Sequence, residues 1–530
     1  MEWIKMINVK QIPEFNKALP LIETIEDAGY EAYFVGGGVR DTLLNLSISD
    51  VDIASSATPD EIQRIFPITF DVGIKHGTVM VLNDKETYEI TTFRTESKYE
   101  KFRRPEKVDY VRSLQEDLKR RDFTINAIAL SRTGVIKDPF DGQEDIKARL
   151  IRAVGNPVER FREDALRMMR AARFVSQLGF EIEAETKEAV VDYHPLLSKI
   201  AIERVREEFV KLLMGRNRKG GLKFFVETRL FHMCPGFQNK HEELIDLALF
   251  PMQFKTSLSA WTTLLYFFSV PQENVDSFLR GWKLSNNEIS NIQKAYRALI
   301  IRFDKFWDYP LLFETGIEIA TEIEELITGF GFTNDSNRLL ALDKTMPIHR
   351  IQDMAINGKE VMALLDTHRG GPYLGEILAD VKQRILTERL ENNKAVISEF
   401  IDKRRLIYLD EVMMKSYTVT EEETAEHVGS GDLAVLSSPS LIAYMENCCK
   451  EMMKDLLNEG ETSVGTFVTM KHSAPSKVGA VIVIEARIKE LSGSKYSFSI
   501  VAKDSDEIIA QGEHTRVIVK SERFMKNVTK

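Results

Sequence analysis

The stretch Phe34-Val-Gly-Gly-Gly-Val-Arg-Asp-Thr-Leu-Leu44, followed by Asp50-Val-Asp52-Ile-Ala54, decides how the first four hundred residues are interpreted. An apolar run that ends in three glycines and continues into an amphipathic segment predicts a strand, a tight turn and a helix. Glycines at such a turn let the backbone approach phosphate oxygens that a side chain would block. Asp50 and Asp52 are two residues apart, so on a strand they share one face. Two carboxylates on one face suit Mg²⁺, the cation that bridges nucleotide phosphates.

Each of these signals has a plain structural explanation when taken alone, because most glycine clusters are ordinary turns and Asp-x-Asp commonly marks a solvated strand edge. In this order they resemble the nucleotidyltransferase head of the polymerase-beta superfamily. The match to Gly-Gly-x-Val-Arg-Asp and Asp-x-Asp-Ile-Ala is closest to the class II tRNA nucleotidyltransferases, the CCA-adding enzymes. This resemblance implies that Gly37, Gly38 and Arg40 contact the nucleotide. The sequence has no Gly-x-x-x-x-Gly-Lys-Ser/Thr run, so a P-loop has no support.

Length and composition bound the class of protein. The chain has 530 residues, too many for one hydrophobic core, which suggests about three to five domains. A hydrophobic share of 43% and a charged share of 29% are those of an ordinary globular protein, and no apolar run reaches the roughly eighteen residues of a membrane helix. The residues from Met1 to Met6 show no signal-peptide pattern. We therefore expect neither membrane insertion nor export.

Cysteine content limits the cellular compartments that the protein is expected to occupy, and net charge limits how it can bind RNA. Cys234, Cys448 and Cys449 give neither a disulfide framework nor a metal-ligand spacing, so the cytoplasm is the expected compartment. The formal net charge of -10 argues against RNA binding over the whole surface. Any RNA must therefore meet a local basic patch.

Two further segments belong to the predicted head. Apolar and polar residues alternate over residues 73–82 and 87–94, as in paired strands. Between the Asp pair and the first of these strands, Thr58 followed by Pro59 predicts the start of a helix. Glu89 lies on the second strand. The superfamily usually carries a third carboxylate on a neighbouring strand, so the resemblance implies a catalytic role for Glu89. The alternative is an exposed strand glutamate.

Residues 94–112 are charged, aperiodic and interrupted by Pro105, which predicts a mobile loop. Tyr99 and Phe102 lie between basic residues and are candidates for RNA contact, although a charge run is more often merely solvated. In CCA-adding enzymes the corresponding loop is needed for the final A. The resemblance therefore implies addition of A as well as C.

A second motif, Leu118-Lys-Arg-Arg-Asp-Phe-Thr-Ile-Asn-Ala-Ile-Ala129, closely matches the family's Arg-Arg-Asp-Phe-Thr-x-Asn-Ala. Asp122 is expected to cap the start of a helix. The resemblance implies that Arg121 and Asn126 face the triphosphate and the ribose of the nucleotide.

The segment Arg162–Arg173 is a strong helix former in which Asp164 and Arg167, three residues apart, are expected to share a face. Cytosine and adenine each present an NH₂ donor beside a ring-nitrogen acceptor, whereas uracil and guanine reverse that order. One carboxylate beside one guanidinium therefore matches C and A. The family uses this Glu-Asp-x-x-Arg motif as a protein template, and the resemblance extends nucleotide contacts to Arg170 and Arg173. The alternative is an ordinary surface ion pair.

The rest of the chain predicts further domains. From Gly220 to about Ile401 the periodicity is helical, and the last 117 residues change to one helix followed by strand-like runs, which predicts a hotdog fold. The expected fold is multidomain: an α/β nucleotidyltransferase head, an all-α neck, body and tail, and an α+β hotdog domain. The expected domains are a head (1–150), a neck with the nucleotide-selecting helix (151–219), a helical body (220–335), a tRNA-binding tail (336–413) and the hotdog domain (414–530).

The appended domain resembles the fluoroacetyl-CoA thioesterase-like hotdog family through Ser438–Cys448 and Gly465–His472. That family places a hydroxyl residue, a Glu eight positions later and a His around an acyl-CoA thioester, which implies a catalytic site of Ser438, Glu446 and His472. Members usually carry Thr where Ser438 stands, so fluorine selectivity does not carry over. Each residue also has a structural explanation, since Ser438 before Pro439 suits a helix N-cap, Glu446 an exposed helix position and His472 a strand end.

Together these motifs predict an enzyme that adds CCA to the 3′ end of tRNA from CTP and ATP, with Mg²⁺ held by Asp50 and Asp52 and with Glu89 as a further catalytic carboxylate. The hotdog domain is expected to hydrolyse acyl-CoA and to form a homodimer, because hotdog sites usually lie between two subunits. The alternatives are a poly(A) polymerase of the same superfamily with a hotdog module that only binds acyl-CoA or dimerises, and a catalytically inactive RNA-binding scaffold.

Overall fold

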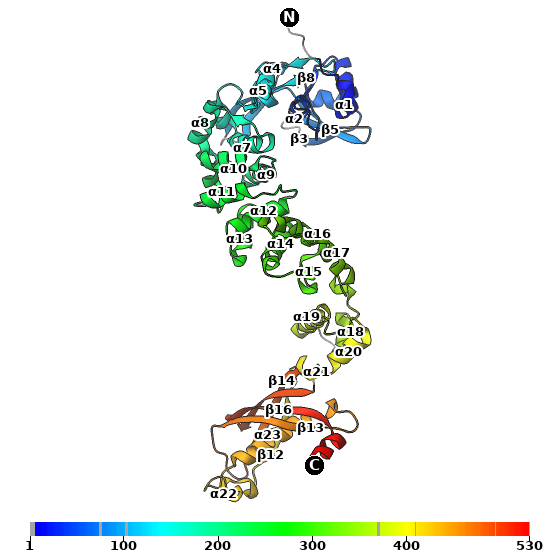
Figure 1. The fold of residues 1–530 in the computed structure, drawn as a ribbon, viewed down its shortest axis with the longest axis vertical. Helices are drawn as coiled ribbons and strands as arrows, with labels where there is room; N and C mark the ends of the chain where they lie inside the picture. Colours follow the sequence, from blue (N-terminus) through cyan, green and yellow to red (C-terminus); the bar gives the residue numbers. More distant parts are fainter. Residues whose placement is uncertain are drawn as a thin grey trace. The chain divides into compact units, whose positions relative to one another are not determined.

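The computed structural model of the chain describes residues 6–73, 77–100, 104–367, 371–408, 410–492 and 494–528. It contains two compact units (Figure 1). The first covers the chain up to Trp307 together with Glu314–Ala341, and the second covers Asp308–Phe313 and the chain from Leu342 onward. The α/β head, the helical middle and the C-terminal hotdog sheet confirm the predicted fold class. The five domain boundaries given above stay predictions.

The head contains a seven-stranded sheet in the order β3-β4-β5-β2-β1-β8-β9. Its strands are β1 (Ala32–Val35), β2 (Asp52–Ser55), β3 (Thr69–Gly73), β4 (Thr78–Asn83), β5 (Glu86–Thr92), β8 (Ala129–Leu130) and β9 (Ile136–Lys137). β2 runs parallel to β5, and the other neighbours are antiparallel. The predicted strand pair is thus confirmed as β4 and β5, apart from Ile74, Lys75 and His76, which lie outside the described residues.

Helices α1 (Pro13–Asp27), α2 (Gly37–Leu43), α3 (Pro59–Ile65), α4 (Leu114–Lys119) and α5 (Gly142–Ala148) complete the head. The apolar side of α1 is buried, and its Phe15 stacks on Phe34 of β1 with 4.5 Å between the ring centroids. Thr58 caps α3 as predicted, through a capping box with Glu61. The sheet and α1 therefore share one core beneath the glycine turn.

The segment predicted as a mobile loop has a different structure. β6 (Arg94–Glu100) and β7 (Arg104–Tyr110) pair as an antiparallel ribbon, with Arg94 opposite Tyr110. Phe102 lies outside the described residues. Polar residues occupy both alternating sets of positions in this ribbon, so the apolar period of two that usually marks a strand is missing from the sequence. The prediction of a loop was wrong for this reason.

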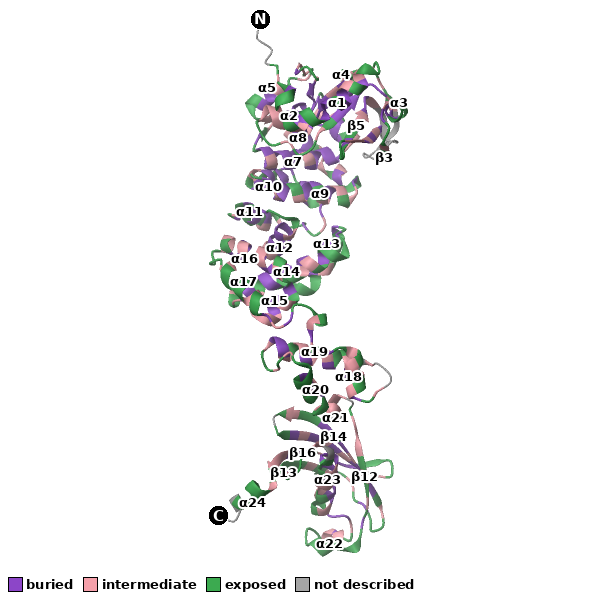
Figure 2. Ribbon diagram, turned by 90° about the vertical axis from the view of Figure 1, so that its right-hand side faces the viewer, coloured by how far each residue is buried: buried purple, intermediate pink, exposed green. Residues whose placement is uncertain are grey.

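Helices make up the neck and body: α6 (Pro157–Glu163), α7 (Leu166–Leu178), α8 (Ala184–Tyr193), α9 (Ile202–Leu213), α10 (Arg218–Glu227), α11 (His241–Leu249), α12 (Ser257–Phe267), α13 (Val275–Gly281), α14 (Asn286–Asp304), α15 (Tyr309–Thr315) and α16 (Ile317–Leu326). A two-residue pair, β10 (Leu150–Ile151) and β11 (Glu181–Ile182), joins them. Phe209 of α9 contacts the rings of Trp261 and Trp282, both fully buried. Figure 2 shows the buried faces of α7 and α10. These tryptophans are core residues.

The second unit contains the tail and the C-terminal domain. Its tail helices are α17 (Ser336–Thr345, shared between the units), α18 (Gly358–Leu364), α19 (Pro372–Leu386), α20 (Lys394–Asp402) and α21 (Arg405–Tyr408). The C-terminal domain has a five-stranded antiparallel sheet in the order β12-β14-β15-β16-β13. Its elements are β12 (Met413–Thr418), α22 (Ala425–Val428), α23 (Ser438–Met452), β13 (Glu461–His472), β14 (Val481–Ser492), β15 (Lys495–Asp504), β16 (Glu507–Lys520) and α24 (Ser521–Val528).

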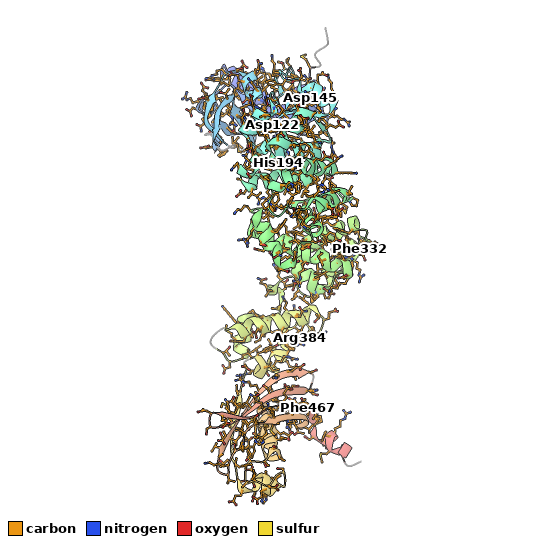
Figure 3. The ribbon with its side chains drawn as sticks, turned by 90° about the vertical axis from the view of Figure 1, so that its left-hand side faces the viewer. Asp122, Asp145, His194, Phe332, Arg384 and Phe467 are labelled. Atoms are coloured by element: carbon orange, nitrogen blue, oxygen red, sulfur yellow. The ribbon has the colours of Figure 1, made fainter. Side chains whose placement is uncertain are left out.

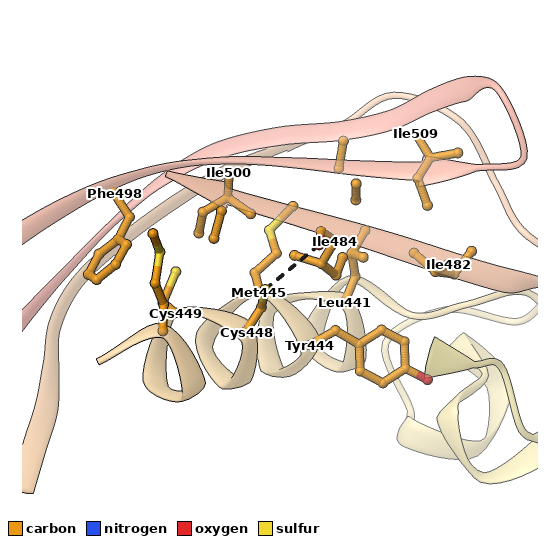
Figure 4. Packing of buried hydrophobic residues seen from close by; sticks show 14 of the residues in the cluster. Leu441, Tyr444, Met445, Cys448, Cys449, Ile482, Ile484, Phe498, Ile500 and Ile509 are labelled. Atoms are coloured by element: carbon orange, nitrogen blue, oxygen red, sulfur yellow. Dashed lines mark hydrogen bonds between the residues drawn. The ribbon is translucent and has the colours of Figure 1, made fainter. Parts of the chain in front are cut away.

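The core of this domain lies between α23 and the sheet (Figure 4). Leu441, Met445 and Cys448 from the helix pack against Ile484 and Ile500 from the strands. Both Cys448 and Cys449 are buried free thiols whose pKa burial raises, so they belong to the packing. One helix wrapped by an antiparallel sheet confirms the predicted hotdog fold.

Among the residues that the structure describes, no helix is both long enough and apolar enough to cross a membrane.

Candidate active site

One cleft of about 980 Å³ in the first unit brings most of the predicted residues of the head and neck together. Every predicted nucleotide-binding or catalytic residue of this region except Gly38 lines it: Gly37, Arg40, Asp50, Asp52, Glu89, Arg121, Asp122, Asn126, Asp164, Arg167, Arg170 and Arg173. The head sheet supplies one wall, and α7 and α9 supply the other.

The glycine turn lies directly against the carboxylates. Gly36 ends β1 with φ +72°, a conformation that favours glycine, and a Cβ there would lie 3.0 Å from Asp52 Oδ2. At Gly38, inside the first turn of α2, a Cβ would lie 3.0 Å from the carbonyl oxygen of Asp50. The predicted strand, turn and helix are confirmed, and the absence of side chains in the turn keeps Asp52 accessible from the cleft.

The acidic residues differ slightly from the expected arrangement. β2 begins at Asp52, so Asp50 lies in the segment before the strand rather than on the strand itself. Asp52 pairs in register with Glu89 of β5. The protein atoms around Asp52 displace water and raise the pKa of its carboxyl, Arg121 opposes this shift, and the charge of Asp50 adds to it. A bound cation would relieve that repulsion.

The carboxylates of Asp50 and Asp52 are the candidate metal ligands of the cleft. Within the described ranges, no three or more His, Cys, Asp or Glu side chains are grouped so that they could hold a metal ion. Mg²⁺ is usually held by one or two carboxylates together with substrate phosphates and water. Asp50 and Asp52 fit this pattern, because both line the open cleft and their charges repel each other.

A chain of hydrogen bonds connects the glycine helix to α7. Arg40 Nη1 donates to Asn126 Oδ1 at 2.7 Å, Asn126 Nδ2 donates to Asp122 Oδ1 at 3.1 Å, and Arg170 Nε donates to Asp122 Oδ2 at 2.6 Å. Burial opposes ionisation of Asp122, but the charge of Arg170 and the hydrogen bonds outweigh it and hold the pKa of Asp122 well below its usual range.

Asp122 was expected to cap a helix, and this was wrong. Only a 3-10 turn, Thr124–Asn126, follows it, and Phe123 occupies the position before that turn. Asp122 instead accepts the backbone N–H of Phe123 at 2.8 Å. A turn of three residues does not present the four free N–H groups that begin an α-helix. The Asp122 carboxylate therefore accepts from Arg170 of α7 instead of capping a helix.

Phe174 and Glu208 also belong to the cleft, and sequence reasoning missed them. The guanidinium carbons of Arg40, Arg170 and Arg173 lie 5.1, 5.3 and 4.3 Å from the centroid of the Phe174 ring. Glu208 Oε2 lies 3.0 Å from Arg173 Nη1. Burial, together with the charge of Arg170, lowers the pKa of Arg173 to about 10. The spacing of Arg170 and Phe174, four apart on one helix, was the available signal.

The predicted base-selecting pair, Asp164 and Arg167, lies where one helix ends and the next begins. α6 ends at Glu163 and α7 begins at Leu166, because Asp164 is extended (φ -137°, ψ 105°) and its Oδ1 accepts the Leu166 N–H at 3.0 Å. The single helix expected over Arg162–Arg173 was therefore wrong. Asp164 and Arg167 have separate partners in the structure.

Each member of this pair is held by its own neighbours. Arg204 Nη2 donates to Asp164 Oδ2 at 2.8 Å. Arg167 Nη1 donates to Glu163 Oε2 at 2.6 Å, and its Nη2 donates to the carbonyl oxygen of Arg120 at 2.6 Å. Both side chains line the cleft, so the cleft wall contains a hydrogen-bond acceptor at Asp164 and a donor at Arg167.

The three predicted site residues of the C-terminal domain lie at two separate positions: Ser438 contacts His472, whereas Glu446 contacts another histidine. Ser437, not Ser438, caps α23 by accepting the Ser440 N–H. The Ser438 hydroxyl is thereby left to His472, whose Nδ1 lies 3.0 Å from Ser438 Oγ. Among the described residues, His472 Nε2 is a buried ring nitrogen without a hydrogen-bond partner.

Glu446 lies about two turns along α23 from Ser438 and contacts a different histidine. Its Oε1 is 3.6 Å from Nε2 of the buried His514, and His514 Nδ1 donates to the Phe467 carbonyl at 2.8 Å. Burial lowers the pKa of His514. His514 pairs with Val468, whereas His472 pairs with Ala510, so the two histidines differ by four residues, about 13 Å, along β13. Within one chain, Glu446 and the Ser438–His472 pair thus do not meet.

Comparison with known proteins gives matches along most of the chain. Family models match residues 32–152 (Poly A polymerase head domain), 179–240 (Probable RNA and SrmB-binding site of polymerase A), 252–401 (tRNA nucleotidyltransferase domain 2, putative) and 419–522 (Fluoroacetyl-CoA-specific thioesterase).

Similar proteins cover the first three quarters. The CCA-adding enzyme of Enterococcus faecalis is 49% identical over 393 residues, which is 74% of this chain and 97% of that protein. The CCA-adding enzyme of Ligilactobacillus salivarius is 48% identical over the same shares. The crystal structure of the Bacillus stearothermophilus CCA-adding enzyme in complex with CTP is 39% identical, with a TM-score of 0.67 over 74% of this chain and 98% of that one. The chain therefore belongs to the family of CCA-adding enzymes, the tRNA nucleotidyltransferases, and carries in addition a C-terminal domain of the thioesterase hotdog family.

Proposed function

We propose that this enzyme adds C, C and A in turn to the 3′ end of tRNA, using CTP and ATP with Mg²⁺ at Asp50 and Asp52. The observation that carries the proposal is that these carboxylates and the Asp164–Arg167 pair line one cleft. The tRNA 3′-hydroxyl attacks the α-phosphorus, the bond to the β-phosphate breaks, and pyrophosphate leaves. When bound, Mg²⁺ would supply positive charge that neutralises the phosphate oxygens and stabilises the transition state. Glu89 is proposed as a third acidic group beside Asp52.

The protein residues divide this work. The backbone of Gly37 and Gly38 approaches the phosphates, while Arg40, Arg121, Arg170 and Arg173 neutralise their charge. Asn126 and Asp122 hold two of these arginines in place. Asp164 accepts the NH₂ group of cytosine or adenine, and Arg167 donates to the adjacent ring nitrogen. Uracil and guanine present the reverse order and leave both protein groups unsatisfied, which supports selection of C and A.

Changing Asp50 or Asp52 to Asn tests the metal-binding carboxylates. Each variant should lose nucleotide addition by about 10²- to 10³-fold, because the charge that stabilises the transition state is lost. Affinity for tRNA should change little, because basic groups hold the RNA. Incorporation of radiolabelled CTP and filter binding of tRNA that lacks its 3′ CCA measure the two effects. Asp60→Asn, an exposed head residue outside the cleft, is the control. Turnover near the wild-type value in both variants would reject the assignment.

The double variant Asp164→Ala with Arg167→Ala tests base selection. It should use UTP or GTP at a rate closer to CTP, since each lost hydrogen-bonded contact removes about 1–3 kcal/mol of discrimination. The measurement is kcat/KM for the four nucleotides supplied separately. Glu159→Ala with Arg162→Ala is a matched control, because this exposed acid and arginine have the same spacing on α6 but lie outside the cleft. An unchanged preference for C and A in the first variant contradicts the template role.

A second candidate activity is hydrolysis of an acyl-CoA thioester by the C-terminal domain. The Ser438–His472 hydrogen bond and the thioesterase model over residues 419–522 favour it. Ser438 orients the thioester, and His472 or Glu446 activates water. Because Glu446 contacts His514, which lies opposite Val468 and four residues along β13 from His472, a second copy that brings its own Glu446 to the Ser438–His472 pair would complete the site. Acyl-CoA is therefore a proposed ligand and a homodimer the proposed assembly.

Release of free CoA by the full chain from a panel of short and medium acyl-CoAs tests this activity. His472→Ala and Glu446→Gln should each reduce the rate by about 10²-fold or more, because the general acid–base group is lost. His427→Ala, an exposed histidine of α22, should leave the rate unchanged. Equal rates in all variants reject the site, and no hydrolysis by the folded wild type favours a binding or dimerisation module.

The edge strand β13 is the proposed dimer contact. It has a sheet neighbour, β16, on one side only, and Phe467 and Val468 are 53% and 36% exposed. Phe467→Asp should convert a dimer to a monomer, because the new charges would face each other. Light scattering measures the mass. Ile508→Asp on β16, with 44% exposure at the replaced residue, should remain dimeric. A monomeric wild type contradicts the proposal.

A further inference from the structure

Asp117 of α4 is a buried carboxylate that lies outside every motif considered above. Its side chain is 1% exposed. Its Oδ1 accepts from Arg120 Nε at 2.9 Å and Arg120 Nη2 at 2.7 Å, and its Oδ2 accepts from Arg121 Nη2 at 3.3 Å. Burial opposes the charge, but the two arginines outweigh it and keep the pKa of Asp117 below its ordinary value. Asp117 is therefore an anion held between two consecutive arginines.

Arg121 connects this anion to the metal side of the cleft. The point that a Cβ at Gly36 would occupy lies 3.4 Å from Arg121 Nη1 and 3.0 Å from Asp52 Oδ2. Arg121 and Asp52 thus face each other across the glycine turn, and Arg121 lowers the pKa that burial raises. Any rotation of Arg121 changes the field at Asp52.

Arg120 connects the same anion to the base-reading side. Its guanidinium is bound by Asp117, and its backbone carbonyl accepts from Arg167 Nη2 at 2.6 Å. That carbonyl is the acceptor for Arg167 Nη2, while Glu163 accepts from Nη1. The ribbon is joined here too, because the backbone N–H of Arg94, the first residue of β6, donates to Asp117 Oδ1 at 3.4 Å.

We propose that Asp117 is a positioning residue for nucleotide selection, which fixes the Arg120–Arg121 segment and through it sets Arg121 against Asp52 and Arg167 against the base. The proposal rests on the roles proposed above for Asp52 and Arg167. Asp117 itself does not line the cleft, so it acts through its neighbours. A carboxylate that served folding alone would affect all four nucleotides equally.

The variant Asp117→Asn tests this role in the full-length enzyme. It keeps the shape of the side chain but loses the charge that holds two guanidinium groups. We expect kcat/KM for CTP to fall by about 10- to 100-fold, and the CTP-to-UTP ratio of kcat/KM to fall by about 10-fold, because misplacing a reactive group by about 1 Å has effects of this size. The affinity for tRNA should be unchanged.

Asp145→Asn is the matched control, and both Asp145 and Asp122 are labelled in Figure 3. Asp145 is also buried in the head, at 6% exposure, and accepts from Thr124 Oγ1 at 2.6 Å and Arg152 Nε at 3.1 Å, yet it lies outside the cleft lining. Its loss should lower the melting temperature and leave the CTP-to-UTP ratio at the wild-type value.

Three results overturn the proposal: an unchanged ratio in folded Asp117→Asn, an equal change of ratio in Asp145→Asn, or a changed tRNA affinity that accounts for the whole loss. If Asp117→Asn does not fold, the CTP-to-UTP ratio of kcat/KM is measured in Asp117→Glu instead. This variant keeps the negative charge but displaces the carboxylate. A wild-type enzyme that fails to add C contradicts the proposed function instead, so the two failures are distinguishable.

Discussion

One ion pair joins the head to α7, the helix that carries Arg167. Arg170 of α7 donates to Asp122 at 2.6 Å, and Asp122 is tied through Asn126 to Arg40 of the glycine helix. Buried ion pairs contribute little net stability, because desolvation offsets the attraction, but breaking one leaves an uncompensated charge. The pair therefore acts mainly on geometry. It fixes the distance between the phosphate side and the base side of the cleft, on which every proposed contact to the nucleotide depends.

The parts of this arrangement that sequence could predict are local ones. The strand, glycine turn and helix around Gly36, the cap at Thr58 and the pairing of β4 with β5 follow from short patterns whose cause lies within a few residues. The cleft residues were found because they lie in sequence motifs of a known family, in which the corresponding positions have assigned roles. The resemblance supplied what periodicity alone does not contain, namely that distant segments share one cleft.

The failures have a common physical cause, which is competition between a side chain and the backbone. Asp164 breaks the expected helix by accepting its own chain's Leu166 N–H, and Ser437 takes the cap that the structural alternative gave to Ser438. Asn, Asp, Ser and Thr offer the backbone such alternatives, and nothing in the sequence tells which neighbour will use them. Glu208 was missed for another reason: its partners Arg170 and Arg173 lie on another helix, and the residues meet only in the folded chain.

The join between the tail and the hotdog domain is a structured segment. Residues 402–418 contain neither glycine nor proline, so they lack the composition of a flexible linker. Ile407 of α21 packs against the hotdog core, and Tyr408 Oη donates to Asp380 of α19 at 2.7 Å. A short helix that is buried on one side and hydrogen-bonded on the other transmits displacement better than a loose tether does. The tail and the hotdog sheet lie in one compact unit, and α21 contacts both of them.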